Sequence, residues 1–239
     1  MEAFEGWLAG AQAHRRAYSR PLVTLSYAQS LDGSLALPGG HPTCISGPES
    51  QRMTHRLRAL HQAILVGIGT VLADDPLLTV RLVEGEHPQP IVLDSRLRTP
   101  RQARVLSVHP KPAWIVAVEG YPPGQRAALE SAGGRVLVLP EDGSGRVHLP
   151  GLLGCLGEMG VSSLMVEGGA QVISSFLSQT LVDQVILTIA PMFLGGLKAL
   201  DQGVFAFTGS AAGGSSKTLT EVGYERLGED LIVWGKLAH

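Results

Sequence analysis

Short runs of apolar residues recur along this chain, and helix-spaced segments separate most of them. A short continuous apolar run bounded by turn residues is typical of a parallel strand that is buried on both faces. The apolar runs are Ala63–Val66, Ile91–Leu93, Trp114–Val118, Val136–Leu139, Leu164–Val166 and Val185–Ile189. The helix-spaced segments are Glu49–Leu60, Gln125–Ala132, Leu152–Met159 and Gln171–Ser178. This alternation predicts an α/β fold, with a largely parallel mixed sheet flanked by helices.

The two ends of the chain depart from this alternation. Residues 2–17 carry apolar residues at helical spacing and predict a helix that leads into a first strand at Leu22–Ser26. Near the other end, Thr218–Leu227 and Leu231–Leu237 flank a Gly-Glu-Asp turn, which predicts a closing antiparallel hairpin. The stretch Thr208–Ser216 is rich in Gly, Ser and Ala and predicts a loop rather than a domain boundary.

Length and charge narrow the class of protein. The 239 residues suit a single domain over 1–239, with residues 1–20 as a helix and lead-in. The 19 Lys and Arg residues against 21 Asp and Glu give a net charge of −2, so we expect no nucleic-acid or membrane partner. Cys44 and Cys155 lie far apart, so neither a disulfide framework nor a metal site is expected. Without a signal-peptide pattern, we expect a cytoplasmic protein.

Two glycine turns follow predicted strands. After Ala63–Val66 comes Gly67-Ile68-Gly69-Thr70, and after Leu164–Val166 comes Glu167-Gly168-Gly169. Glycines at such turns let the backbone approach a ligand, and the amides of the next helical turn attract anions. The first turn fails as a dinucleotide fingerprint because Leu72 replaces the third glycine. Either turn alone is more often structural, but a dinucleotide needs two phosphate-binding regions, and the chain offers two candidates.

Several arginine side chains are also candidates for binding a phosphate group. Asp94-Ser95-Arg96-Leu97-Arg98 follows a predicted strand, where an acidic residue often binds a ribose hydroxyl. Ser95 and the two arginines suit a 2′-phosphate instead, and a solvated basic turn is equally consistent with the pattern. Arg58 and Arg81 are further candidates, because arginine binds phosphate in a bidentate manner.

Sequence patterns of other enzyme classes do not occur. The chain has no Walker motif, no HExxH, no Gly-x-Ser-x-Gly and no zinc-deaminase pair of motifs. Kinase, metalloprotease, serine hydrolase and zinc-deaminase functions are therefore disfavoured.

Taken in order, the motifs resemble those of the riboflavin-biosynthesis pyrimidine reductases. The resemblance spans residues 21–237 and implies a dihydrofolate-reductase-like fold that forms homodimers. Its segments are Leu31-Asp32-Gly33, Gly67–Pro76 with Leu78-Thr79, Leu93-Asp94-Ser95, Val166–Gly169, Leu181-Val182-Asp183 and Ile189-Ala190-Pro191 with Leu194-Gly195-Gly196. The segments Val23–Asp32 and Met53–Arg58 are similar to the stand-alone fungal type, which acts before the pyrimidine is deaminated.

The resemblance also implies a cofactor and a set of contacts. It implies NADPH, and with the glycine turns the expected cofactor contacts are Ala28, Gly67, Gly69, Thr70, Asp74, Ser95, Gly168, Gly169, Ala170, Gln171, Val172, Ile173, Ser174 and Ser175. The implied substrate contacts are Arg58, Leu78, Arg81 and Glu167. Asp32 or a water molecule is the candidate proton donor.

The expected function is therefore NADPH-dependent reduction of a ribosylaminopyrimidine 5′-phosphate, whose ribosyl group becomes ribityl. Whether the substrate is the aminated or the deaminated pyrimidine stays open. Two alternatives also stay open: a dihydrofolate-reductase-like enzyme with another substrate, and a non-catalytic NADPH-binding relative.

Overall fold

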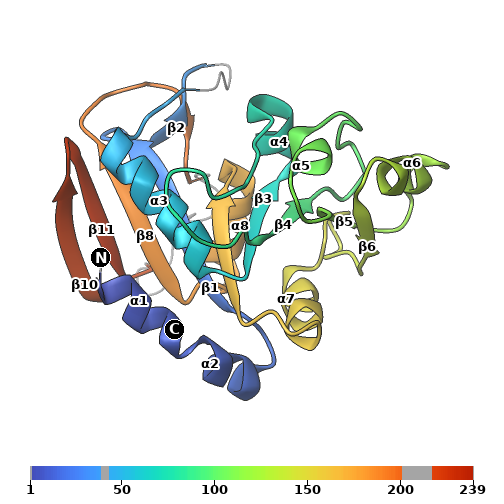
Figure 1. Cartoon of the computed structure of the whole chain (residues 1–239), viewed down its shortest axis with the longest axis horizontal. Coiled ribbons are helices and arrows are strands. Elements are labelled where there is room, and N and C mark those ends of the chain that lie inside the picture. The colour runs from blue at the N-terminus through green and yellow to red at the C-terminus, as the bar shows by residue number, and fades with distance from the viewer. Residues whose placement is uncertain (1, 39–42, 201–216, 239) are drawn as a thin grey trace, which may run out of the picture. The chain divides into compact units, whose positions relative to one another are not determined.

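A computed structural model describes residues 2–38, 43–200 and 217–238 and follows the alternation of strands and helices (Figure 1). Within these ranges the helices are α1 (Glu2–Ala9), α2 (Ala11–Tyr18), α3 (Pro48–Leu60), α4 (Ile68–Asp74), α5 (Arg104–Ser107), α6 (Gln125–Ser131), α7 (Leu149–Glu158) and α8 (Ala170–Ser178). The strands are β1 (Leu22–Ser30), β2 (Ser34–Ala36), β3 (Ala63–Gly67), β4 (Gln89–Leu93), β5 (Trp114–Ala117), β6 (Arg135–Val138), β7 (Ser163–Gly168), β8 (Gln184–Ala190), β9 (Leu197–Lys198), β10 (Leu219–Leu227) and β11 (Asp230–Leu237).

The described residues form two compact units, each assembled from separate parts of the chain. The first contains residues 2–22 and 54–165, and the second contains 23–53 and 166–238. In the first unit β3, β4, β5 and β6 stand side by side and parallel, with Leu65 opposite Ile91 and Val92 opposite Ile115 (Figure 1). Because β3 is buried along its whole length, its sequence is continuously apolar.

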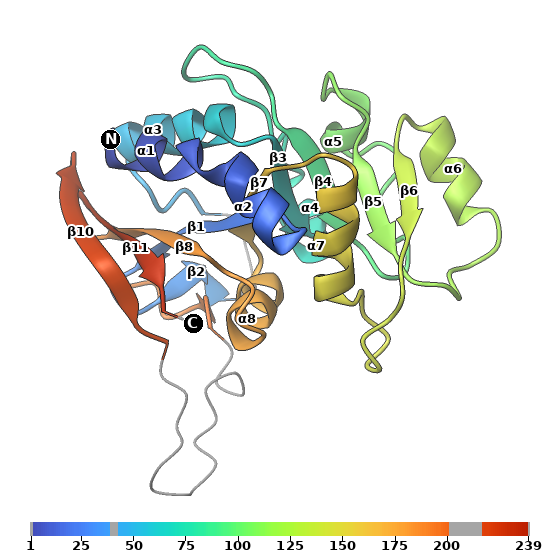
Figure 2. The ribbon, with the colours of Figure 1, turned by 90° about the horizontal axis from the view of Figure 1, so that it is seen from below.

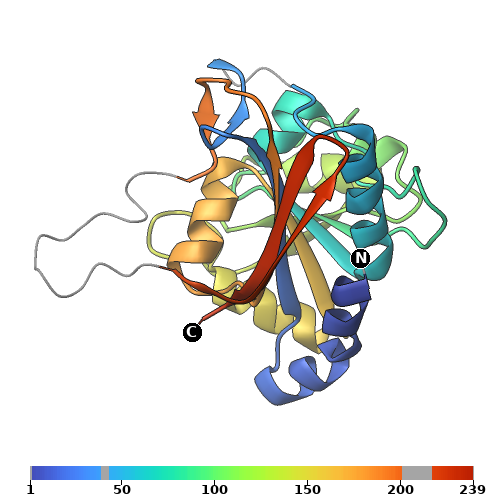
Figure 3. The ribbon, with the colours of Figure 1, turned by 90° about the vertical axis from the view of Figure 1, so that its left-hand side faces the viewer.

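The second unit combines parallel and antiparallel pairs. β1 and β8 run parallel, with Ser26 opposite Ile186, and β11 pairs antiparallel with β8. β10 and β11 form the hairpin seen at the front of Figure 3, and α8 lies along one face of β1 and β8 in Figure 2. A short separate ribbon joins β2 to β9.

The structure confirms the α/β class, the mostly parallel strands with flanking helices, and the C-terminal antiparallel hairpin. The single helix predicted over residues 2–17 is wrong, because α1 and α2 are separated at Gly10, a residue that favours helix ends. The ribbon of β2 and β9 and the short helix α5 were not predicted. The loop predicted at Thr208–Ser216 lies outside the described residues.

Within the described residues, no helix is long and apolar enough to cross a bilayer.

Helix α7 packs closely on the chain that follows α2. Arg15 donates from Nη1 to the Gly157 carbonyl at 3.1 Å and from Nε to the Ser162 hydroxyl at 3.0 Å. A Cβ atom on Gly157 would lie 2.5 Å from the Ser19 carbonyl oxygen, so this contact requires glycine. Gly154 lies in the same helix, and a Cβ atom there would meet no atom within 4 Å.

These two glycines predict opposite effects on stability. Gly157→Ala should lower the free energy of unfolding by about 1–3 kcal/mol, because backbone must move to admit the methyl group. Gly154→Ala should raise it by about 0.5–1 kcal/mol, because alanine favours the helix and meets no obstacle. Urea unfolding of both variants tests the pair, and equal effects would contradict this account of α7 packing.

Candidate functional site

The first glycine turn joins β3 to α4. Gly67 precedes α4 in an extended conformation, and no side chain caps the first turn of the helix, where the half-buried Thr70 lies. Asp74 is the last residue of α4, and desolvation raises the pKa of its carboxyl. The next residue, Asp75, adopts a left-handed conformation and accepts a hydrogen bond from the Arg104 amide at 2.8 Å. Uncapped amides thus follow a buried strand, as an anion site requires.

The segment between α4 and β4, here called the 75–88 loop, brings three predicted substrate residues together. Arg58 on α3 donates from Nη1 to the Thr79 carbonyl at 3.1 Å. Arg81 donates from Nη1 to the Thr79 hydroxyl at 2.7 Å, so two guanidinium groups converge on one residue. Leu78 has a φ of 54° and is 1% exposed, and its side chain belongs to the hydrophobic core. Only the Leu78 backbone can therefore face a ligand.

The second glycine turn joins β7 to α8. Glu167 is half-buried near the end of β7, and Gly168 and Gly169 follow with φ values of 117° and 82°. Such left-handed conformations favour glycine, which explains the pair. No side chain caps the amides that open α8, so this turn also suits a phosphate.

The run predicted to follow this turn divides by burial. Val172, Ile173 and Ser174 are buried and can offer a ligand only their backbone. Ala170 and Ser175 are half-buried and Gln171 is exposed, so their side chains remain accessible. Ala28, on β1 opposite Thr188, is half-buried.

Asp94 does not lie where a ribose could reach it. Its side chain is fully buried, and Oδ2 accepts hydrogen bonds from the Thr99 amide at 2.7 Å and the Thr99 hydroxyl at 2.8 Å. The Arg98 Nε atom lies 3.6 Å from Oδ1. Asp94 therefore closes the turn that follows β4, and the ribose interpretation of Asp94 is wrong.

Beside this turn lies a hollow of about 470 Å³. It is formed where β4, β5 and β6 end, at the edge of a parallel sheet where ligands usually bind. Its lining residues are Ser95, Arg96, Leu97, Arg98, Val118, Glu119, Gly120, Pro122, Gln125, Glu141 and Gly145. The sequence predicts Ser95 but not the residues after β5 and β6, which belong neither to the two predicted glycine turns nor to the loop at Asp94. The shared edge of parallel strands was the signal that could have found them.

The donor set of this hollow fits the adenosine end of a phosphorylated nicotinamide cofactor. A hydroxyl at Ser95 and guanidinium groups at Arg96 and Arg98 can bind a phosphate, and the volume is ordinary for a ligand site. The chain also has two uncapped helix starts, at α4 and at α8, and the amides of each suit a phosphate group.

Asp32 is surrounded by donors. Lys198 donates from Nζ to Oδ2 at 2.7 Å. The other donors are the hydroxyls of Ser30 and Ser34 and the amides of Leu194 and Gly195, the amides at 3.0 and 2.9 Å. The hydrogen bond from Lys198, followed by those from Ser30 and Leu194, holds the pKa of the Asp32 carboxyl far below its usual range. The geometry does not fit a proton donor, because this carboxylate holds no proton to give near neutral pH. Asp32 instead ties the segment after β8 to the end of β1.

Among the described residues, no group of three or more His, Cys, Asp or Glu side chains could hold a metal ion.

Comparisons with known proteins agree with one another. Residues 21–233 match the RibD C-terminal domain family. A protein of Methanothermobacter thermautotrophicus named 2,5-diamino-6-ribosylamino-4(3H)-pyrimidinone 5′-phosphate reductase is 44% identical over 75% of this chain and 82% of its own length. The riboflavin biosynthesis protein RibD of Aquifex aeolicus is 36% identical over 91% of this chain, which spans 58% of that relative. The solved structure of the Saccharomyces riboflavin biosynthesis reductase Rib7 is 30% identical, covers 92% of this chain and 91% of its own, and superposes with a TM-score of 0.70.

The environment of Asp32 predicts a pH dependence of stability. Below about pH 4 the carboxyl of the unfolded chain, with a usual pKa of 3.8, takes up a proton that the folded carboxylate does not. The contribution of Asp32 is therefore present above this range and is lost as the pH falls. Asp32→Asn should unfold at lower urea concentration than the wild type at pH 7, and the difference should shrink at pH 3. A difference that does not change between the two pH values would contradict a stabilising role for the ionised Asp32 carboxylate.

Proposed function

Because the chain belongs to the RibD C-terminal domain family, we propose that it is an NADPH-dependent reductase that converts the ribosyl group of a ribosylaminopyrimidine 5′-phosphate to ribityl. The observation that carries the proposal is the convergence of Arg58 and Arg81 on Thr79, within a segment that matches the family motif. Two guanidinium groups at one residue form a strong site for a phosphate dianion.

The substrate proposal extends to the pyrimidine. Relatives named 2,5-diamino-6-ribosylamino-4(3H)-pyrimidinone 5′-phosphate reductase share 42% and 44% identity with this chain and are covered over 83% and 82% of their length. This favours the aminated pyrimidine over its deaminated form as the preferred substrate. A homodimer and a cytoplasmic location belong to the same proposal.

When bound, NADPH supplies the hydride for the reduction, and the chain supplies binding, orientation and charge. The Ser95 hydroxyl and the Arg96 guanidinium would bind the 2′-phosphate. The amides before and within the first turn of α8 would bind the pyrophosphate. Thr70 and Asp74, on α4, and Ala28, on β1, complete the cofactor contacts that we propose.

Each side chain on the substrate side has a separate task. Arg58 and Arg81 hold the 5′-phosphate and so fix the sugar, which lowers the entropic cost of reaching the reactive geometry. The Glu167 carboxylate accepts hydrogen bonds from ribosyl hydroxyls. The ribose ring opens before it takes up the hydride, and a water molecule donates the accompanying proton, because Asp32 already accepts hydrogen bonds from five donors.

An absorbance assay tests the function directly. Purified protein is mixed with NADPH and either the aminated or the deaminated pyrimidine, and the loss of absorbance at the reduced-nicotinamide band is followed. We expect faster turnover of the aminated compound. Faster turnover of the deaminated compound would reverse the proposed substrate preference. No oxidation of NADPH with either compound would refute the function, and turnover of dihydrofolate would indicate another reductase of the same fold.

The hollow beside Ser95 predicts how the protein selects NADPH over NADH. Arg96→Ala should raise KM for NADPH about tenfold, the equivalent of ~1.4 kcal/mol, and leave KM for NADH unchanged. The matched control is Arg126→Ala, which removes an arginine that pairs with Glu130 and does not line the hollow. An equal change in KM for both cofactors would contradict the assignment of the 2′-phosphate to Arg96.

A further inference from the structure

Two imidazoles take the place of a strand partner in the 75–88 loop. The loop contains neither helix nor strand, so its backbone amides have no ladder partner and need other acceptors. The Arg81 amide donates to Nδ1 of His55 at 2.9 Å, and the Val80 amide donates to Nδ1 of His87 at 3.0 Å. A nitrogen that accepts a hydrogen bond carries no proton, so both rings have their proton on Nε2 and are uncharged.

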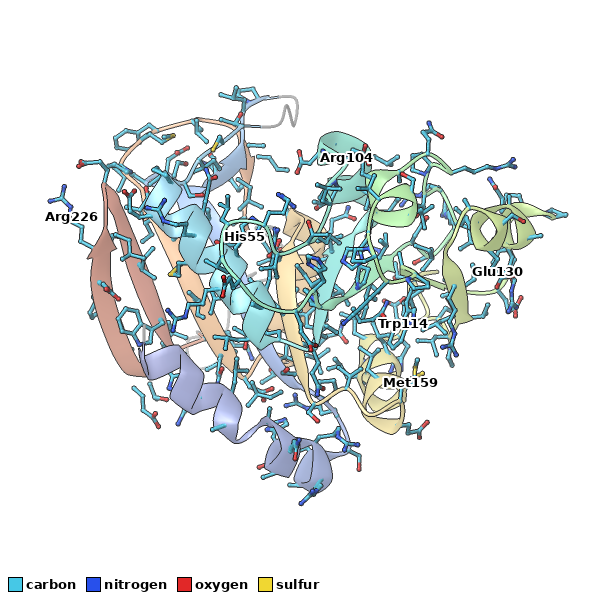
Figure 4. The ribbon with its side chains drawn as sticks, viewed as in Figure 1. His55, Arg104, Trp114, Glu130, Met159 and Arg226 are labelled. Carbon is cyan, nitrogen blue, oxygen red and sulfur yellow. The ribbon has the colours of Figure 1, made fainter. Side chains whose placement is uncertain are left out.

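His55 holds the loop against α3. It is 6% exposed and lies on the same side of the helix as Arg58 and Ala59, at the place labelled in Figure 4. The loop approaches this helix closely at Gly85, where a Cβ atom would lie 2.5 Å from that of Ala59. One stretch of α3 therefore contacts the loop through a hydrogen bond from the Arg81 amide, a hydrogen bond to Thr79 and a close packing contact.

His87 also contacts a second imidazole, that of His109. The rings of His87 and His109 meet edge to face, with centroids 5.9 Å apart. His109 is 7% exposed, and its Nδ1 lies 3.0 Å from the Lys111 amide nitrogen and 3.1 Å from the Lys111 carbonyl oxygen. Burial, the largest of the causes, lowers the pKa of His109 and so favours the uncharged form of the ring beside His87.

The residue type of these acceptors matters for an anion site. A carboxylate at either position would also accept the amide hydrogen, but it would add negative charge close to the guanidinium groups of Arg58 and Arg81. A neutral imidazole accepts the hydrogen bond without that charge.

We infer that His55 and His87 are positioning residues: they fix the backbone of Val80 and Arg81 so that the Arg81 guanidinium meets the substrate phosphate together with Arg58. This inference rests on the proposed function, and it adds two residues that act through Arg81 without touching the substrate.

Kinetics of two His55 variants test the inference. His55→Leu keeps the bulk of the side chain and removes the acceptor, whereas His55→Asn retains an acceptor oxygen near the position of Nδ1. We expect His55→Leu to raise KM for the pyrimidine about tenfold, ~1.4 kcal/mol, with kcat changed by less than about twofold. His55→Asn should restore KM to within about threefold of the wild type. If both variants have the KM of the wild type, or both lose kcat alone, the inference is wrong.

A double-mutant cycle shows whether the effect passes through Arg81. In a chain that already carries Arg81→Ala, His55→Leu should raise KM little further, because the residue that it positions is gone. A full additional tenfold rise would overturn the inference. The control is His148→Ala: Nδ1 of His148 also accepts a backbone amide, that of Gly151 at 3.1 Å, but it caps α7. This variant should lose stability and keep KM.

Amide hydrogen exchange gives a readout that needs no substrate. Without ligand, His55→Leu should speed exchange at the Arg81 amide and His87→Leu at the Val80 amide, while His55→Asn should exchange as the wild type does. Unchanged exchange in both leucine variants would refute the inference even if the enzyme is active. If the wild-type protein oxidises no NADPH with either pyrimidine, the proposed function fails, and the exchange rates still decide whether the imidazoles fix the loop. Should His55→Leu not fold, His87→Leu, at a half-buried position, carries the same kinetic and exchange comparisons.

Discussion

Burial of the parallel strands on both faces decides where this chain can have a binding or catalytic site. β3 is buried over its whole length, and the middle of β4 is equally inaccessible. Strands of this kind leave no side chain for a ligand, so the polar residues gather where the strands end. Helix α4, which carries Thr70, follows β3, and the 75–88 loop follows that helix. Ser95 and Arg96 follow β4. The candidate site is thus a consequence of how the sheet excludes water.

Loops that follow buried strands, or the helices after them, must find acceptors for their backbone amides, and side chains serve as these acceptors at several places in the described residues. Asp94 accepts the Thr99 amide, Asp32 accepts those of Leu194 and Gly195, and the imidazole of His55 accepts that of Arg81. A hydrogen bond from a backbone amide to a side chain stabilises one conformation of the loop, so each acceptor fixes its loop at one position. The polar residues that look most like catalytic groups in the sequence are therefore partly structural.

Elements whose pattern lies within one segment of the chain were predictable from the sequence, whereas contacts between distant segments were not. Continuous apolar runs locate β3, β4 and β8, because burial on two faces leaves a pattern within each segment. Helices α3 and α6 follow from residue spacing in the same way. The ribbon of β2 and β9 depends on pairing between residues 34–36 and 197–198, which no local pattern encodes. The same holds for Asp32, whose donors at Leu194 and Lys198 lie more than 160 residues away.

The turn after β4 and the 75–88 loop each contain arginine, but the side chains that accept their backbone amides differ in charge. In the turn after β4 the acceptor is a carboxylate, and the Arg98 Nε atom lies 3.6 Å from it, so part of the Arg98 charge is offset by Asp94. Arg96, on the same turn, is exposed and lines the hollow, which is why we propose Arg96 rather than Arg98 as the phosphate ligand. In the 75–88 loop the acceptors are imidazoles, which add no negative charge to the surroundings of Arg58 and Arg81. In the proposed site, Arg81 of this loop and Arg58 of α3 bind a dianion, so the loop amides need acceptors that do not repel that dianion. A neutral imidazole accepts the hydrogen bond and adds no negative charge.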